Sequence, residues 1–151
     1  LHTNDAPATL VRLRNMGTAT YNIAASVTLI TAQRLVRCLC PHCKQAVILT
    51  REILEQAGLP STAMPDEPVL AYVPTGCDLC HKGFSGRTGI FQVMPISATM
   101  QTLILNDASG QALSAQAQRE GVLSLRVAGL RKVLQGITSL DEVLAATRDD
   151  A

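Results

Sequence analysis

The stretch RCLCPHCKQ, residues 37–45, contains three of the 5 cysteines in this chain. Cys40 and Cys43 are separated by two residues, and the same C-x-x-C spacing returns in GCDLC with Cys77 and Cys80. Two such turns can place four thiolates around one tetrahedral ion, and soft sulfur ligands favour Zn²⁺ over Mg²⁺ or Ca²⁺. The segment between the pairs is longer than in short zinc ribbons, but the cost of closing a loop grows slowly with its length. The spacing therefore predicts one tetracysteine zinc site.

Four thiolate ligands leave no open coordination position for water, which indicates a structural zinc site and not a hydrolytic one. Both pairs are expected in tight turns, where backbone N–H groups can point at the sulfurs and stabilise their charge. The alternative is a pair of redox-active or unpaired C-x-x-C motifs. A redox protein of the thioredoxin type has a single C-x-x-C in a βαβ frame, and neither pair here begins a convincing helix. The zinc interpretation is favoured.

The remaining cysteine and two histidines lie close to the pairs in sequence. Cys38 belongs to a run of strand-forming residues, so we expect it to be a buried strand residue and not a ligand. His42 and His81 lie inside or beside the C-x-x-C turns. Because four thiolates already complete the shell, we expect both histidines to face solvent.

The composition is that of a globular protein in a reducing compartment. Of the 151 residues, 47% are hydrophobic and 17% are charged, which excludes a disordered chain. The formal net charge of +1 gives no support for a nucleic-acid surface. The odd number of cysteines argues against a disulfide framework. The sequence opens at Leu1 without a signal peptide, and this start without Met leads us to expect a fragment of a longer protein.

Capping residues and hydrophobic periodicity predict a mixed chain of the α/β class. We expect helices over residues 4–16 and 20–26 and then a strand over 27–37. Thr50 caps a short helix that Gly58 ends. The other expected elements are strands at 69–73 and 88–94 and helices that begin at Ser97, Ser109, Ser124 and either Thr138 or Ser139. Four charged residues of the last two helices are expected to form a solvated face: Arg126, Arg131, Asp141 and Glu142.

Five motifs occur along the chain in a recognisable order: LHTNDA, AQRLVRCLCPHCK, GCDLCHKGFSGRTGIFQVMPIS, AQAQREG and LRKVLQGITSLDEVLAAT. Together they resemble the C-terminal part of the secretion ATPases, the hexameric motors of type II secretion and type IV pilus assembly. The runs VMPIS, AQAQREG and QGITSLDEVL most resemble the pilus-assembly ATPases, and the type II secretion ATPases come next. Retraction ATPases of the pilus generally lack a tetracysteine insert, so the four cysteines argue against them.

The resemblance implies a fold and a division of the chain. Residues 1–37 are expected to be the end of a RecA-like P-loop ATPase core, 38–84 a zinc-binding insert, and 85–151 a strand followed by a helical C-terminal subdomain. The phosphate-binding loop is expected before this segment, since no G-x-x-x-x-G-K-[ST] motif occurs in it. We therefore expect the intact protein to use ATP and Mg²⁺ and the isolated chain to be inactive.

The same resemblance implies candidate residues for the nucleotide. LHTN matches the family's His box, so His2 is the candidate to lie near the γ-phosphate, where an imidazole can hydrogen-bond a phosphate oxygen. Arg87, in GRTG, and Arg34, in QRLVR, are candidates to contact nucleotide or a neighbouring subunit, because guanidinium groups suit phosphates and carboxylates. An ordinary surface ion pair is the alternative for either arginine. Arg34 and Arg37 point to opposite faces if their run is a strand.

The resemblance also implies partners and a location. We expect a homo-hexamer of the intact protein, in the cytoplasm and peripheral to the inner membrane, acting on an inner-membrane platform protein. No nucleic acid and no direct membrane insertion are expected. Two alternatives remain: a type II secretion ATPase fragment and a stand-alone zinc-binding interaction module.

Overall fold

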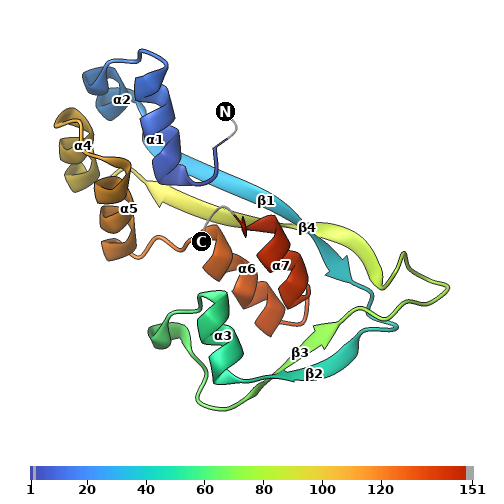
Figure 1. Cartoon of the computed structure of the whole chain (residues 1–151). Coiled ribbons are helices and arrows are strands. Elements are labelled where there is room, and N and C mark those ends of the chain that lie inside the picture. Colours follow the sequence, from blue (N-terminus) through green and yellow to red (C-terminus); the bar gives the residue numbers. More distant parts are fainter. Residues whose placement is uncertain (2, 149–151) are drawn as a thin grey trace. The chain divides into compact units, whose positions relative to one another are not determined.

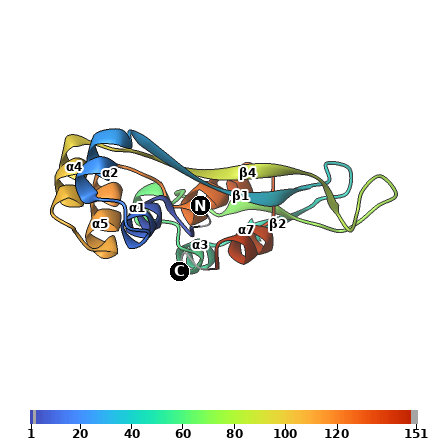
Figure 2. The ribbon, with the colours of Figure 1, turned by 90° about the horizontal axis from the view of Figure 1, so that it is seen from above.

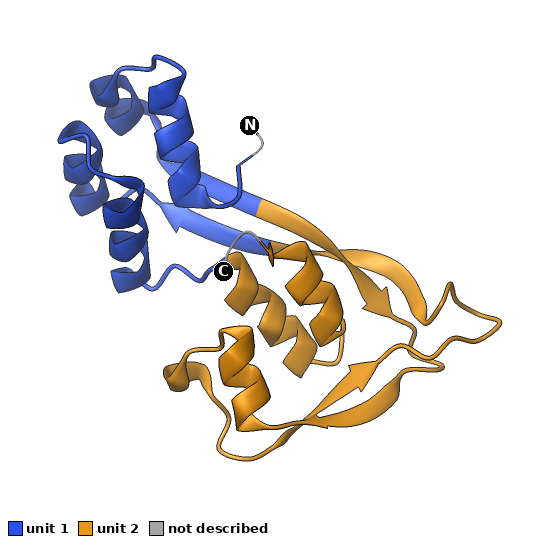
Figure 3. Ribbon diagram, viewed as in Figure 1, with its two compact units in different colours: residues 1–32, 91–124 blue, residues 33–90, 125–151 orange. Residues whose placement is uncertain are grey.

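The computed structural model describes residues 1 and 3–148 (Figure 1). His2, the expected nucleotide-sensing residue, lies outside the described residues. The chain forms two compact units (Figure 3). Unit 1 consists of Leu1–Ala32 and Phe91–Ser124, and unit 2 consists of Gln33–Ile90 and the chain from Leu125 onward. The mixed α/β class is confirmed, and no helix within the described residues has the length and apolar character needed to span a bilayer.

Unit 1 is built around four helices: α1 (Ala6–Asn15), α2 (Thr20–Ser26), α4 (Ala98–Leu105) and α5 (Gly110–Arg119). The side chains of Asp5, Ser97 and Ser109 each accept a backbone N–H from the first turn of the helix that follows, which confirms the predicted starts at Ser97 and Ser109. α1 packs against α5 and α2 against α4, as both ribbon views show (Figures 1 and 2). Their contact buries one apolar cluster: Ala6, Leu10, Ile23, Ala24, Ile30, Met94, Met100, Ile104, Leu113 and Ala117.

Unit 2 contains α3 (Arg51–Ala57), α6 (Leu125–Leu134) and α7 (Leu140–Ala146), a 3₁₀ turn at Ser61–Ala63, and the two-stranded sheet of β2 (Gln45–Leu49) and β3 (Val69–Val73). Thr50 caps α3 and Gly58 ends it with a φ of 102°, as predicted. Of the two caps expected for the last helix, Thr138 and Ser139, it is Ser139 that caps α7. The sequence did not predict β2. Its antiparallel register with β3 places Val47 opposite Ala71.

A second two-stranded sheet pairs β1 (Leu29–Leu39) with β4 (Phe84–Pro95). Each of these strands begins in one unit and ends in the other. Within unit 1 the N–H of Ile96 donates to the carbonyl of Thr28 at 2.9 Å, and within unit 2 the N–H of Cys40 donates to the carbonyl of Gly83 at 2.9 Å. Because an early residue of one segment pairs with a late residue of the other, the strands are antiparallel. β1 begins and ends two residues later than predicted, and β4 extends beyond both of its predicted limits.

The expected solvated face on the last two helices is wrong in two positions. Arg126 donates to the carbonyl of Ala57, at 2.9 Å, and to Thr147, so its guanidinium links the C-terminal ends of α3 and α7. Glu142 accepts hydrogen bonds from Arg37, a residue 105 positions earlier. These partners are distant in sequence, so the local charge pattern could not reveal them.

Candidate metal centre

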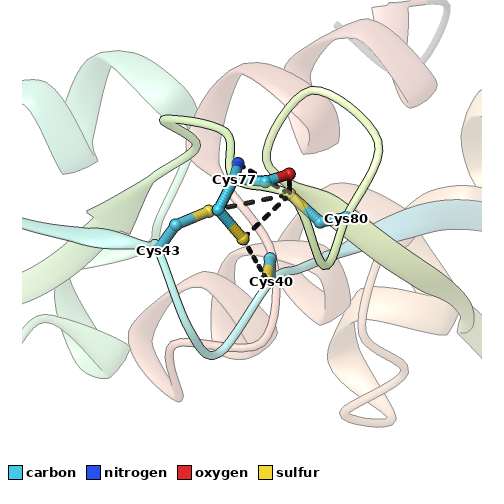
Figure 4. A group of neighbouring side chains, drawn as sticks. All are labelled: Cys40, Cys43, Cys77 and Cys80. Carbon is cyan, nitrogen blue, oxygen red and sulfur yellow. Dashed lines mark hydrogen bonds between the residues drawn. The ribbon is translucent and has the colours of Figure 1, made fainter.

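The four cysteines of the two C-x-x-C motifs meet in unit 2 (Figure 4). Their sulfur atoms all lie within 4.8 Å of one another. The Sγ atoms of Cys40 and Cys77 are 3.9 Å apart, and those of Cys43 and Cys80 are 3.7 Å apart. A Zn–S bond of about 2.3 Å in a tetrahedral site separates the sulfurs by about 3.8 Å. The group thus has the size and the donor type that a tetrathiolate metal site requires.

Two tight turns bring the sulfurs together. The first, which we call knuckle A (Cys40–Cys43), connects β1 to β2, and its backbone closes where the N–H of Lys44 donates to the carbonyl of Cys40 at 3.0 Å. The second, knuckle B (Cys77–Cys80), lies between β3 and β4, and its backbone closes through a 3.3 Å bond from the N–H of Cys80 to the carbonyl of Cys77. The group therefore lies where the chain passes from one sheet to the other and back.

Backbone N–H groups point at two of the sulfurs, as expected from the sequence. The N–H of Gly76 lies 3.3 Å from the Sγ of Cys43, and those of Cys77 and Gly83 each lie 3.3 Å from the Sγ of Cys80. Such donors favour the thiolate over the thiol, because they stabilise negative charge on sulfur. The metal-binding form of the cysteines is thus supported by the backbone of knuckle B and its flanks.

Glycine is required at one of these donor positions. Gly83 has a φ of 90°, and a Cβ atom there would lie 2.4 Å from the Cβ of Pro74. Only a residue without a side chain fits this close approach, and a left-handed conformation costs other residues free energy as well. The turn that supplies an N–H to Cys80 therefore depends on this glycine.

The thiols differ in acidity. The hydroxyl of Thr75 lies against Cys43 and, with the N–H of Gly76 adding to its effect, lowers the pKa of Cys43 to about 6. The N–H of Leu79 acts to lower the pKa of Cys77, but loss of hydration and the other three sulfurs outweigh it and raise that pKa to about 12. With its pKa raised this far, the thiol of Cys77 keeps its proton near neutral pH. A bound cation would displace the remaining protons.

Polar contacts attach knuckle A to the C-terminal part of unit 2. The Nζ of Lys44 donates to the carbonyl of Gly136 at 2.9 Å and lies 4.3 Å from the ring centroid of Tyr72. A Cβ on Gly136 would approach the ring of Tyr72 to 3.1 Å, so the loop after α6 packs closely on β3. No local sequence pattern predicts this role for Lys44, because its partners lie far along the chain.

An ion pair attaches the strand before knuckle A to α7. The Nε and Nη2 atoms of Arg37 each donate to the carboxylate of Glu142 at 2.9 Å, and its backbone N–H donates to the same carboxylate at 3.1 Å. The guanidinium also lies 4.0 Å from the ring centroid of Phe84, the first residue of β4. Arg37 lowers the pKa of Glu142, chiefly by hydrogen bonding, so this carboxylate stays ionised.

The other predicted residues do not join the group of four. Cys38 is half-buried in β1, and His42 and His81 are exposed. Arg34 is half-buried on β1 and Arg87 is exposed on β4. Among the described residues, neither arginine side chain has a hydrogen-bond or ion-pair partner. Their roles, like the binding of zinc, stay predictions.

Comparison with known proteins gives the family. Residues 1–145 match the family model described as type II/IV secretion system protein. The chain is 44% identical over 149 residues to the type IV pilus assembly ATPase PilB of Pseudomonas aeruginosa, a match that covers 99% of this chain and 26% of that protein. It is 44% identical over 154 residues to PilB of Myxococcus xanthus, with 99% and 26% covered.

A relative from the other secretion pathway is nearly as similar. The type II secretion system ATPase E of Vibrio cholerae is 42% identical over 150 residues, with 99% of this chain and 29% of that protein covered. The chain thus spans between a quarter and a third of the length of these curated relatives. The family match over nearly the whole chain and the agreement of these relatives lead to one conclusion: the chain belongs to the type II/IV secretion system protein family.

Proposed function

We propose that this chain is the C-terminal part of a hexameric cytoplasmic ATPase that powers type IV pilus assembly through a platform protein in the inner membrane. The proposal is supported by relatives named as pilus assembly ATPases, which are 44% identical along 99% of the chain. Because the chain covers about a quarter of their length, ATP hydrolysis is assigned to the whole protein and not to this part of it. The isolated chain is expected to be inactive.

Within that protein we assign the four cysteines to a structural zinc ion. The observation that carries this assignment is the spacing of the sulfurs, 3.7–3.9 Å in the pairs measured, which fits a tetrahedral tetrathiolate site. Such an ion would cross-link the two turns and would take no part in catalysis. The chain's own contribution is to hold two turns so that their sulfurs and N–H groups converge.

The nucleotide is expected to meet this part of the protein at few positions. A RecA-like core would supply the phosphate-binding loop and the Mg²⁺ site from residues outside this chain. Here we assign His2 to the neighbourhood of the γ-phosphate, and Arg87 and Arg34 to contacts with nucleotide or an adjacent subunit. The lack of side-chain partners for the two arginines among the described residues leaves their charge available for such contacts.

Two measurements test the proposal. The purified chain should contain about one zinc ion per molecule, as a four-thiolate site implies, when it is prepared without chelator. The intact protein should hydrolyse ATP, and His2→Ala should lower its turnover more than its melting temperature. A chain without metal would refute the zinc site, and unchanged turnover in the variant would remove His2 from the nucleotide site.

Type II secretion is the second candidate, because the ATPase E of Vibrio cholerae is 42% identical over nearly the whole chain. The two candidates predict different defects in a cell from which the gene has been deleted. Loss of surface pili with normal protein secretion supports the pilus motor, and the reverse supports the secretion motor.

A stand-alone zinc-binding interaction module remains the alternative from outside the enzymes. It predicts a reading frame without a phosphate-binding loop upstream of Leu1. An upstream loop followed by ATPase activity of the intact protein would exclude this alternative.

A further inference from the structure

Gln92 is a polar residue at an inward position of β4. In this strand the buried positions alternate with exposed ones, and Gln92 shares the buried face with Met94. Only 6% of Gln92 is exposed, while Phe91 and Val93 on the other face are 47% and 48% exposed. Burying a carboxamide costs free energy unless it is hydrogen-bonded, so a glutamine here needs a partner. Its two neighbours, Phe91 and Val93, are apolar and yet exposed, so the burial of Gln92 is the reverse of what the residue types predict.

The partner of Gln92 is the beginning of α1. Its Oε1 accepts the backbone N–H of Ala6 at 2.7 Å, in a buried bond between residues 86 positions apart. Ala6 is the first residue of α1, where N–H groups have no partner within the helix. The described residues, 1 and 3–148, give the Nε2 group of Gln92 no acceptor.

The other printed side-chain bonds at this helix start are local. Asp5 caps the helix by accepting the N–H of Ala8 at 2.7 Å, and the hydroxyls of Thr3 and Thr9 are 2.7 Å apart. These bonds shape the first turn but do not attach it to another element. Within the described part of unit 1, the bond that Gln92 accepts from Ala6 is thus the side-chain hydrogen bond that attaches the start of α1 to β4.

We propose that Gln92 is a positioning residue for the segment that carries His2. This inference rests on the proposed function, in which His2, four positions before Ala6, acts near the γ-phosphate. Without the bond to Gln92, Asp5 still caps α1, but the chain entering the helix loses its attachment to β4. A displacement of about 1 Å in a catalytic group can lower a rate by about a hundredfold.

The test uses the intact protein and three variants. Gln92→Met keeps the length of the side chain and removes the acceptor, whereas Gln92→Glu keeps an oxygen that can accept the N–H of Ala6. Gln101→Met is the matched control, because the Nε2 of Gln101 donates to the carbonyl of Ala24 at 3.1 Å in the same unit but away from α1. We expect Gln92→Met to lower kcat about tenfold or more with KM nearly unchanged, and the other two variants to stay within about twofold of wild type.

A double variant separates positioning from a general loss of structure. If Gln92 acts through His2, then Gln92→Met in a His2→Ala background should lower kcat no further. Additive losses, or an equal loss in Gln101→Met, would overturn the inference. If Gln92→Met does not fold, Gln92→Asn takes its place, since its shorter side chain keeps an amide but withdraws the acceptor from Ala6.

Hydrogen exchange gives a readout that does not depend on activity. The amides at the start of α1 should exchange faster in Gln92→Met or Gln92→Asn than in Gln92→Glu, and those of α4 should not change. Unchanged exchange at α1 would contradict the inference. A wild-type intact protein without ATPase activity would instead refute the proposed function, so the two failures are distinguishable.

Discussion

In unit 1 four helices share one apolar cluster, whereas the knuckle region of unit 2 has almost nothing buried. From Pro41 to Ile48 and from Tyr72 to Lys82, no residue is buried, and Cys40 is the only buried member of the four cysteines. This region is held by sulfur atoms, backbone N–H groups and polar side chains that reach to α6 and α7. The comparison shows two arrangements within one chain, apolar burial in one unit and a tetracysteine group with polar contacts in part of the other. They should fail under different conditions.

The largest expected effect comes from removing one sulfur. Cys77→Ser should reduce the zinc content from about one ion per chain to near zero, because a four-thiolate site loses a ligand. Hydrogen exchange should then rise around both knuckles and in β2 and β3, while α1 and α5 of unit 1 keep their protection. Metal analysis and exchange mass spectrometry measure both changes.

Cys38→Ser is the matched control for that loss. Cys38 is half-buried in β1 and lies outside the group of four sulfurs, so its replacement should leave the zinc content unchanged. An equal loss of zinc in both variants would mean that the ligand set is wrong.

Shortening a buried side chain in unit 1 should lower stability without changing the zinc content. Leu10 is 1% exposed, and Leu10→Ala should lower the free energy of unfolding by about 2–5 kcal/mol through lost burial and the cavity that remains. The zinc content should not change. Met16→Ala, at a side chain that is 63% exposed, should cost about 0.5 kcal/mol or less. Denaturant unfolding and metal analysis check both variants, and zinc loss in Leu10→Ala would contradict the independence of the two arrangements.

A smaller effect is expected from a methyl group at Gly83. Gly83→Ala should lower the free energy of unfolding by roughly 2 kcal/mol and weaken zinc binding in a chelator competition, because Pro74 blocks the Cβ and the backbone is left-handed. Gly86→Ala is the control, since its φ of 78° imposes backbone strain but no atom lies within 4 Å. Equal zinc affinity in the two variants would show that the approach to Pro74 is unimportant for the site.

The smallest effect is expected at the ion pair of Arg37 and Glu142. The side chains are 49% and 17% exposed, so solvent screens the pair and Arg37→Met should destabilise the protein only slightly, and less at high salt. Arg37 lowers the pKa of Glu142 in the folded protein. The stabilisation is therefore present above the ordinary glutamate pKa of about 4.3 and is lost as the pH falls through the lower folded value. Unfolding curves at pH 7 and pH 3 should differ less in Arg37→Met than in wild type, and an equal difference would contradict the pairing.

Most of the helices could be predicted from the sequence because their signals are local. Thr50, Ser97, Ser109 and Ser139 each cap a helix within three residues of their own position. The convergence of the cysteines could be predicted as well, since their spacing constrains where the turns must meet. The chain division at residues 37 and 84 stays a prediction.

The features that could not be predicted from the sequence depend on residues far away along the chain. β2 is a five-residue strand between knuckle A and the cap of α3, and its partner β3 begins 20 residues after it ends, so no local pattern distinguishes it from a loop. Arg126 and Glu142 seemed to belong to a solvated face because helical spacing says nothing of carbonyl and guanidinium groups elsewhere in the unit. The burial of Gln92 could not be predicted either, because its neighbours Phe91 and Val93 are apolar and their pattern places a glutamine between them on the solvent side.

The two knuckles also bear on the order in which the chain folds. Cys40 follows β1 and Gly83 precedes β4, and a hydrogen bond joins these two residues, yet α3 and both strands of the other sheet lie between them in the sequence. Closing such a loop before any contact forms carries an entropy cost that slows folding. A metal ion captured by both knuckles ties the two ends of the excursion together, so that β1 and β4 meet with the loop already closed. Refolding of this sheet should then be faster with zinc present than without it.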